Sequence, residues 1–210
     1  MKKKKHIVII GGIILVVLAG VVMFLGRNSR ELPLENSPLP FSRLEIELSD
    51  SGELAFSAEI KKGELYGLIG PNGAGKSTTM NILTGYLSAS AGRVSIDGID
   101  ILSDPIGAKK LIGYLPEQPP VYLDMTVDEY LNFNYELKGC TLEREPHLAE
   151  ICEVVKISHV RKRLIRNLSK GYRQRVGVAQ ALIGNPPVII FDEPTVGLDP
   201  KQIIEIRSLI

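Results

Sequence analysis

The sequence Gly70-Pro71-Asn72-Gly73-Ala74-Gly75-Lys76-Ser77-Thr78 decides the fold of this 210-residue chain. It matches the pattern G-x-x-x-x-G-K-[ST], and it lies between a short apolar run at 65–69, predicted to be a buried strand, and a predicted helix. Its glycines allow backbone N–H groups to curl around phosphate oxygens, and the dipole of the following helix favours negative charge. A chance match in a chain of this size has a probability of about one percent, so phosphate binding is favoured over an ordinary glycine turn.

Three side chains at the end of this loop have predicted roles toward a bound nucleotide. The ammonium group of Lys76 would bridge the β- and γ-phosphates, and the hydroxyl group of Ser77 would ligate magnesium. Thr78 would contact the α-phosphate side. The loop therefore predicts a site for ATP and Mg²⁺ that uses all nine residues from Gly70 to Thr78.

A second candidate site follows the apolar stretch at 188–191, which predicts a buried strand that ends in two carboxylates. The carboxyl ends of strands are where open α/β sheets bind their ligands. Asp192 would hold magnesium, directly or through water, and Glu193 would polarise the attacking water as a general base. Taken alone, an apolar run followed by two acidic residues is as often a capped strand end as a catalytic site. The phosphate-binding loop upstream favours the catalytic interpretation.

Two further motifs flank this strand. The sequence LSKGYRQR at 168–175 stands before it, and GLD at 197–199 stands after it. Together with the phosphate-binding loop, they resemble the motifs of the ATP-binding-cassette (ABC) family, from about Leu44 to the end of the chain. The sequences GPNGAGKST, IGYLPE and DEPTVGLDP most resemble those of ATPase subunits of exporters whose permeases are separate chains. The resemblance implies an α/β fold, a P-loop NTPase cassette core with a mixed sheet and a helical signature subdomain at about 125–170.

The resemblance also implies that two cassettes work as a homo- or heterodimer. In the family, the signature covers the γ-phosphate of ATP bound to the opposite subunit, so Ser169 and Gly171 would act in trans at a helix N-terminus. Asp199 of the D-loop would belong to the same dimeric ATP site. Lys170 and Tyr172 depart from the commonest family signature, Leu-Ser-Gly-Gly-Gln, which leaves the assignment intact and changes the expected contacts.

The glutamine loop of the family corresponds to IGYLPE at 112–117. Glu117 stands where the family usually has glutamine, and Gln118 lies one position later, so that either side chain would approach the magnesium. By resemblance, residues 119–130 would meet the coupling helix of a membrane permease.

Both ends of the cassette depart from the family pattern. The strand that normally carries an adenine-stacking aromatic residue has Glu47 in that neighbourhood, and Phe41 is the alternative. The chain ends at Ile210, before the switch histidine and the final strands that the resemblance implies, and none of its three histidines is in the right place for that role. We therefore expect a cassette that is truncated at its C-terminal end, in a fragment or chimaera.

The N-terminal segment IVIIGGIILVVLAGVVMFLG at 7–26 contains no charged side chain and has the length of a bilayer-spanning helix. We predict one transmembrane helix here, as an uncleaved anchor; the alternative is a signal peptide with the lysines at 2–5 as its n-region. The positive-inside rule places these lysines in the cytoplasm and the following residues across the membrane, away from cellular ATP. We hypothesise that this segment was not selected together with the cassette, which we expect at the cytoplasmic face of the cell membrane.

The predicted domains are a transmembrane or signal-anchor segment at 1–29, a proline-containing linker at 30–43 and the nucleotide-binding domain at 44–210. The 25 basic and 24 acidic side chains nearly cancel, so the net charge does not favour nucleic acid as a partner. The arginines at 161–175 are interpreted as a solvated face. Cys140 and Cys152 are predicted to be reduced structural thiols.

The predicted function is ATP binding and hydrolysis that energises a separate membrane permease, most consistent with an exporter. The alternative is a membrane-tethered nucleotide-binding module, or a truncated or chimaeric product, without full turnover. A GTPase is disfavoured because the chain contains no Asn-Lys-x-Asp motif to read a guanine base.

Overall fold

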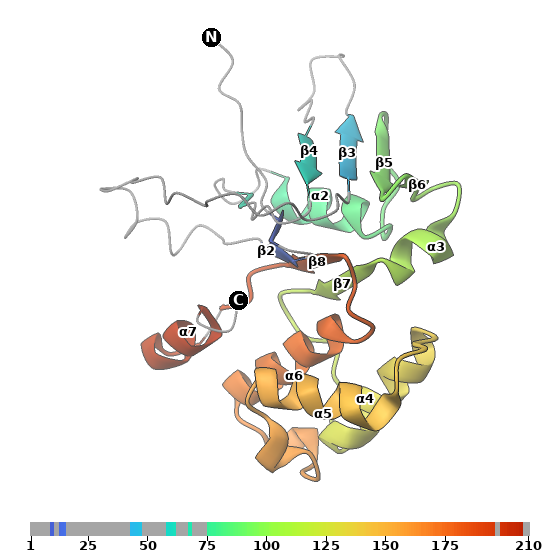
Figure 1. Cartoon of the computed structure of the whole chain (residues 1–210). Coiled ribbons are helices and arrows are strands. Elements are labelled where there is room, and N and C mark those ends of the chain that lie inside the picture. Colours follow the sequence, from blue (N-terminus) through green and yellow to red (C-terminus); the bar gives the residue numbers. More distant parts are fainter. Residues whose placement is uncertain are drawn as a thin grey trace, which may run out of the picture. The chain divides into compact units, whose positions relative to one another are not determined.

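The computed structural model describes residues 9–10, 13–15, 43–47, 58–61, 67–68, 75–195 and 198–207 (Figure 1). The chain divides into two units, Met1–Leu111 and Ile112–Ile210. Residues 70–74 of the phosphate-binding loop and Gly197 lie outside the described residues, as does the alternative adenine-stacking residue Phe41.

The first unit contains an antiparallel sheet with the strand order β4-β3-β5-β6. Its strands are β3 (Arg43–Glu47), β4 (Ala58–Lys61), β5 (Arg93–Ile96) and β6 (Ile99–Asp100). Leu44 stands opposite Ile60 on one side and Ile96 on the other, and both of these isoleucines are 1% exposed. The alternation of apolar and acidic residues from Leu44 predicts a hairpin or strand pair at a sheet edge, and β3 and β4 confirm the pair. The sequence RVSIDGIDI predicts two strands about an Asp-Gly turn, which is confirmed between β5 and β6, where both turn residues have positive φ.

Two helices of the first unit are α2 (Lys76–Leu83) and α3 (Pro105–Lys110). Helix α2 follows the phosphate-binding loop as predicted, and it buries Met80 and Leu83. The strand predicted at 65–69 is not found in its described part, because Gly67 and Leu68 belong to no strand. Leu68 is nevertheless 8% exposed, which shows that a short apolar run indicates burial more reliably than strand pairing.

The transmembrane helix predicted at 7–26 is not confirmed. Ile9–Ile10 (β1) and Ile13–Leu15 (β2) form two short antiparallel strands, and the other residues of the segment lie outside the described part of the chain. Isoleucine, a β-branched residue, favours strands. Among the described residues, no helix has the length and apolar character that a bilayer crossing requires.

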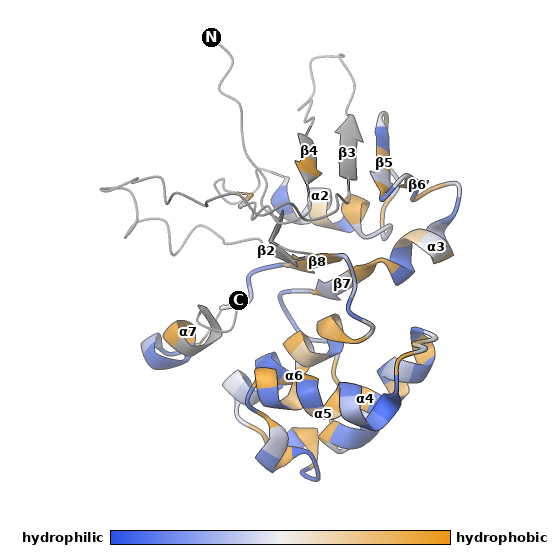
Figure 2. Cartoon of the chain, viewed as in Figure 1, coloured by the Kyte–Doolittle hydropathy of each residue, from blue (hydrophilic) through white to orange (hydrophobic). Residues whose placement is uncertain are grey.

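The second unit is built on two parallel strands, β7 (Ile112–Leu115) and β8 (Val188–Phe191). Its helices are α4 (Val127–Leu137), α5 (Arg144–Val154), α6 (Lys170–Leu182) and α7 (Pro200–Arg207), with short 3₁₀ turns η1 (Ser158–Val160) and η2 (Ile165–Asn167). Every residue of β8 is buried, which explains its continuous apolar sequence (Figure 2). The predicted strand is therefore confirmed.

The Thr-x-x-Glu spacing at 126–129 predicts the start of one helix, and Ser169 is the predicted N-cap of another, with a predicted stop at Gly184 and Asn185. Helices α4 and α6 begin at these predicted positions. Thr126 and Glu129 form the predicted capping box at the start of α4, in which each side chain accepts from the other residue's backbone N–H. Ser169 is the N-cap of α6, and the helix ends at Leu182, before the predicted stop at Gly184 and Asn185. Helices α4, α5 and α6 contact one another pairwise (Figure 1).

Candidate functional site

The described part of the phosphate-binding loop is the N-terminus of α2. Gly75 is its N-cap, with a φ of 82° that favours glycine, and no side chain caps the first turn. Lys76 is 9% exposed, whereas Ser77 and Thr78 are exposed. The first turn contains no acidic residue, so a lysine, two hydroxyl groups and the positive end of the helix dipole form a site suited to an anion.

The carboxyl ends of β7 and β8 bring the predicted acids and the glutamine loop to one edge. The backbone N–H of Asp192 donates to the carbonyl oxygen of Leu115 at 2.8 Å, which extends the parallel pairing by one residue beyond β8. Asp192 is 7% exposed. Glu117 and Gln118 follow β7 on the same edge and are both exposed. The backbone therefore places Asp192, Glu117 and Gln118 at the carboxyl ends of two adjacent parallel strands.

Glu193 has an unusual backbone conformation. Its φ is 46°, in the left-handed region that a glutamate rarely adopts. Such conformations cost free energy and are concentrated at functional sites, where the surrounding structure holds them. The half-buried Glu193 follows the buried Asp192 directly, so the turn gives the two neighbouring carboxylates different environments.

The signature residues lie at the start of α6. Ser169 is exposed, and its hydroxyl oxygen accepts a hydrogen bond from the N–H of Tyr172 at 3.4 Å. Gly171 is buried, and a Cβ atom at this position would lie 2.8 Å from Cδ of Gln202. Any larger residue at Gly171 therefore has to displace the side chain of Gln202.

Asp199 caps α7. Its carboxylate accepts from the N–H of Gln202 at 2.9 Å, and its own N–H donates to Oε1 of Gln202 at 3.4 Å. Gln202 thus connects two predicted site residues, Asp199 and Gly171. The sequence analysis missed Gln202, although the spacing Asp-Pro-x-Gln is that of a capping box with proline at the first helical position.

The segment that enters the signature pairs with the segment that follows the glutamine loop. The N–H groups of Ile165 and Arg166 donate to the carbonyl oxygens of Met125 and Leu123 at 2.9 and 3.0 Å. In the opposite direction, the N–H groups of Val127 and Asp128 donate to the carbonyl oxygens of Arg163 and Arg161 at 3.1 and 2.9 Å. Residues 161–166, which we call the strap, are therefore held against residues 123–128.

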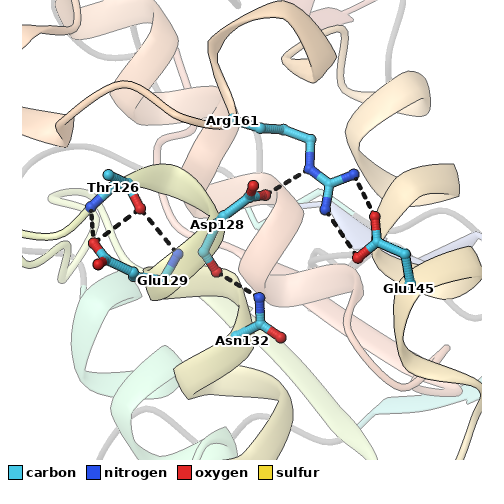
Figure 3. Close-up of polar contacts among 6 residues, drawn as sticks. All are labelled: Thr126, Asp128, Glu129, Asn132, Glu145 and Arg161. Atoms are coloured by element: carbon cyan, nitrogen blue, oxygen red, sulfur yellow. Dashed lines mark hydrogen bonds and ion pairs between the residues drawn. The ribbon is translucent and has the colours of Figure 1, made fainter.

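Arg161 fixes the strap to two helices (Figure 3). Its Nε atom lies 2.5 Å from Oδ1 of Asp128 on α4, and its terminal nitrogens lie 2.9 and 3.3 Å from the carboxylate oxygens of Glu145 on α5. The guanidinium group lowers the pKa of Glu145, mainly through these hydrogen bonds. The interpretation of the arginines as a solvated face is wrong for Arg161, whose side chain is 20% exposed, and for Arg175, which is buried and donates to the carbonyl oxygen of Val155.

The donor set is compatible with a nucleotide-bound magnesium ion. Among the described residues, no group of three or more His, Cys, Asp or Glu side chains is placed to hold a metal by itself. Mg²⁺ commonly binds through one or two carboxylates together with substrate phosphates and water, so a complete protein cage is not required. The buried carboxylate of Asp192 and the exposed hydroxyl of Ser77 are ligands of the appropriate kind.

Residues 55–196, more than half of the chain, match the family model described as ABC transporter. The bacitracin transport ATP-binding protein BcrA of Bacillus licheniformis is 37% identical over 151 residues, which cover 72% of this chain and 49% of BcrA. The lipopolysaccharide export system ATP-binding protein LptB of Escherichia coli is 37% identical over 158 residues, 73% of this chain and 66% of LptB. The chain spans about half or less of the length of the first curated relatives that it matches.

Solved structures agree with this match. An ATP-binding subunit of an ABC transporter superimposes with a TM-score of 0.63 at 27% identity, covering 80% of this chain and 72% of that chain. A putative ABC transporter ATP-binding protein from Pyrococcus furiosus gives the same TM-score at 26% identity, with 80% and 84% covered.

Proposed function

This chain belongs to the ABC transporter family, and we propose that it binds and hydrolyses ATP to energise a separate membrane permease. The observation that carries this proposal is the edge where β7 and β8 end. There Asp192 is held by the carbonyl group of Leu115, and Glu193 follows in a strained conformation. A fixed ligand for magnesium beside a positioned general base is what ATP hydrolysis requires of the protein.

The proposed roles of the chain's own residues follow from their chemistry. Lys76 would neutralise phosphate charge at the N-terminus of α2, and Ser77 and Asp192 are the residues that would supply oxygen ligands to Mg²⁺. The carboxylate of Glu193 takes the proton from the attacking water. Bound MgATP supplies the phosphoanhydride bond that is broken. Gln118 is a further candidate near the metal, since it follows β7 on the edge where Asp192 lies.

A second cassette completes the proposed site. The exposed Ser169 and the first N–H groups of α6 would face the γ-phosphate held by the partner cassette, as the family resemblance implies. Gly171 keeps this helix end close to Gln202, and Gln202 holds Asp199 of the D-loop. In the proposed dimer, each chain contributes a phosphate-binding loop to one ATP and a signature to the other.

The permease is proposed to dock on residues 119–130. Tyr122 and Leu123 are 52% and 45% exposed, and the ring of Tyr122 contacts that of Phe133 edge to face, with centroids 5.6 Å apart. Exposed aromatic and aliphatic side chains of this kind suit a protein partner. Export is the proposed direction, with the cassette at the cytoplasmic face of the membrane, and the similarity to LptB, which is named for a lipopolysaccharide export system, supports it.

Steady-state ATP hydrolysis by the chain and its Glu193→Gln variant tests this function. We expect hydrolysis to fall by about a hundredfold or more in the variant, because general bases contribute roughly that much, while MgATP binding is retained. The matched control is Glu153→Gln, an exposed glutamate on α5, which should hydrolyse ATP at the unaltered rate. Tight MgATP binding without turnover in any of the three proteins would instead support a nucleotide-binding module.

A further inference from the structure

Two side chains from different helices hold the C-terminal end of α6. The Nζ atom of Lys138, at the end of α4, donates to the carbonyl oxygens of Ala181 and Ile183 at 3.3 and 3.0 Å. On α5, Nε2 of His147 accepts a hydrogen bond from the N–H of Gly184 at 2.9 Å. We call Lys138 and His147 the α6 clamp. Lys138 binds carbonyl groups at the end of the helix, where carbonyl groups lack intrahelical partners, and His147 binds the N–H of the residue that follows the C-cap.

The clamped end of α6 is also tightly packed. His147 is 6% exposed. A Cβ atom added to Gly113 of β7 would lie only 2.1 Å from the carbonyl oxygen of Ala181, so the backbones of α6 and β7 approach as closely as glycine allows. The helix end therefore has little freedom to move toward the strand, and the clamp holds it from the side of α4 and α5.

Along the chain, the residues held by the α6 clamp lie between the signature and the two carboxylates proposed to act in ATP hydrolysis. Helix α6 begins at the signature residues Ser169 and Gly171. Residues 183–187 then lead directly into β8, which ends at Asp192 and Glu193. A displacement of this connection would change both the signature end of the helix and the carboxylates beyond the strand.

We propose that Lys138 and His147 are positioning residues for the ATP-driven pairing of two cassettes, because they fix the end of the signature helix. This inference rests on the proposed dimeric function. It assigns a role to two residues outside the proposed nucleotide site, which belong to no motif quoted from the sequence. They act on the partner's ATP only through the placement of Ser169 and Gly171.

The clamp is expected to depend on pH through His147. Its Nε2 atom accepts the Gly184 N–H only while the imidazole is neutral; after protonation, two donors would face each other. Burial lowers the pKa of His147 from its usual value of 6.5. The carboxylate of Glu150 on α5 raises this pKa, and the ammonium group of Lys138 at the end of α4 lowers it. The contact from the end of α6 is the backbone N–H of Gly184. Since the folded-state pKa is lowered, the contribution of the neutral ring is present above pH 6.5 and is lost as the pH falls through the folded-state pKa.

Lys138 contributes differently. Burial lowers its pKa to about 8, so at neutral pH the cationic form predominates and faces the negative end of the α6 dipole. Above this pKa the neutral amine still has N–H donors for the two carbonyl oxygens. We therefore expect MgATP-dependent dimerisation to change more steeply with pH on the acidic side, which we call the acidic limb. The protonation of His147 causes this limb.

Two measurements on the full chain test the clamp: the affinity for MgATP, and MgATP-dependent dimerisation by analytical ultracentrifugation, both from pH 8 to below 6.5. The His147→Leu variant should dimerise roughly two- to tenfold more weakly, the range expected for one lost hydrogen bond, with unchanged nucleotide affinity. His147→Gln places an acceptor that does not titrate near the same point. It should restore dimerisation and remove the acidic limb that the unaltered chain shows. Lys138→Met should weaken dimerisation as His147→Leu does.

The outcomes separate this inference from the function on which it rests. If the unaltered chain does not dimerise with MgATP at any pH, the proposed function fails and the clamp fails with it. If the chain dimerises but His147→Leu is indistinguishable from it, or His147→Gln keeps the acidic limb, only the clamp is wrong. Amide hydrogen exchange at Gly184 in the unaltered chain needs no variant: its protection should fall as His147 is protonated, and constant protection would overturn the proposal.

Discussion

At the scale of single residues, Glu193 is the most informative position. Glu193 directly follows Asp192, whose backbone N–H is hydrogen-bonded to the carbonyl oxygen of Leu115. Its own φ is 46°, so the chain turns sharply at the second of the two carboxylates proposed to act in hydrolysis. A left-handed conformation at a residue other than glycine costs about 1–3 kcal/mol and persists where the surroundings enforce it. We therefore regard the strain as part of the way in which Glu193, the proposed general base, is positioned.

Replacement of Glu193 by glycine should separate stability from activity. Glycine adopts a positive φ readily, so Glu193→Gly is expected to raise the free energy of unfolding by up to about 1 kcal/mol, measured by urea denaturation. The same variant should lose ATP hydrolysis, because the carboxylate is gone. Lys156→Gly is the matched control, since Lys156 is exposed and has a φ of 58°. It should be stabilised similarly and retain hydrolysis, whereas a fully active Glu193→Gly would refute the assigned role.

At the scale of elements, the strap at 161–166 connects the segment that follows the glutamine loop to the signature. Four backbone hydrogen bonds hold residues 161–166 against 123–128. Arg161 adds charged hydrogen bonds to α4 and α5 from a side chain that is mostly buried (Figure 3). The strap leads within a few residues to Ser169, so its attachment determines where the signature helix begins.

The Arg161→Met variant should therefore destabilise the chain. The expected loss is about 1–3 kcal/mol in the free energy of unfolding, because a partly buried guanidinium group with two carboxylate partners is removed. Arg166→Met is the control: Arg166 pairs with Asp124, but their side chains are 57% and 89% exposed. Exposed pairs contribute about 0–1 kcal/mol. Equal losses in the two variants, measured by chemical denaturation, would contradict this account of Arg161.

The local signals in the sequence were sufficient for much of the fold. The capping box at Thr126, the N-cap at Ser169, the Asp-Gly turn and the apolar strand β8 were all predicted, because each depends on residues a few positions apart. The carboxyl edge with Asp192 was predicted for the same reason. These features needed no knowledge of tertiary contacts.

The contacts that join distant segments were not predicted. Lys138 reaches Ala181, His147 reaches Gly184, and Arg161 reaches Asp128, across sequence separations for which no periodic pattern exists. The N-terminal segment shows a different limit. Its uniform apolar sequence satisfies the length rule for a membrane helix, yet its described residues form short strands, since such a run does not by itself distinguish helix from strand.

At the scale of the whole molecule, each of the two units carries its own group of proposed site residues. The first unit carries the N-terminus of α2 with Lys76 and Ser77, and the second carries Asp192, Glu193 and the signature. The chain belongs to the ABC transporter family, and the proposed function combines two such cassettes. The proposed enzyme is complete only when the phosphate-binding loop of one chain is combined with the signature of another.

Complementation between two inactive variants tests this central claim most directly. Lys76→Ala removes the phosphate-binding lysine, and Ser169→Arg blocks the signature, so each variant alone should not hydrolyse ATP. In an equimolar mixture, about half of the dimers are mixed and each has one intact composite site, so about one quarter of the unaltered activity should return. If the mixture remains inactive, or if Ser169→Arg alone retains full hydrolysis, the account of a cassette that acts in trans is contradicted.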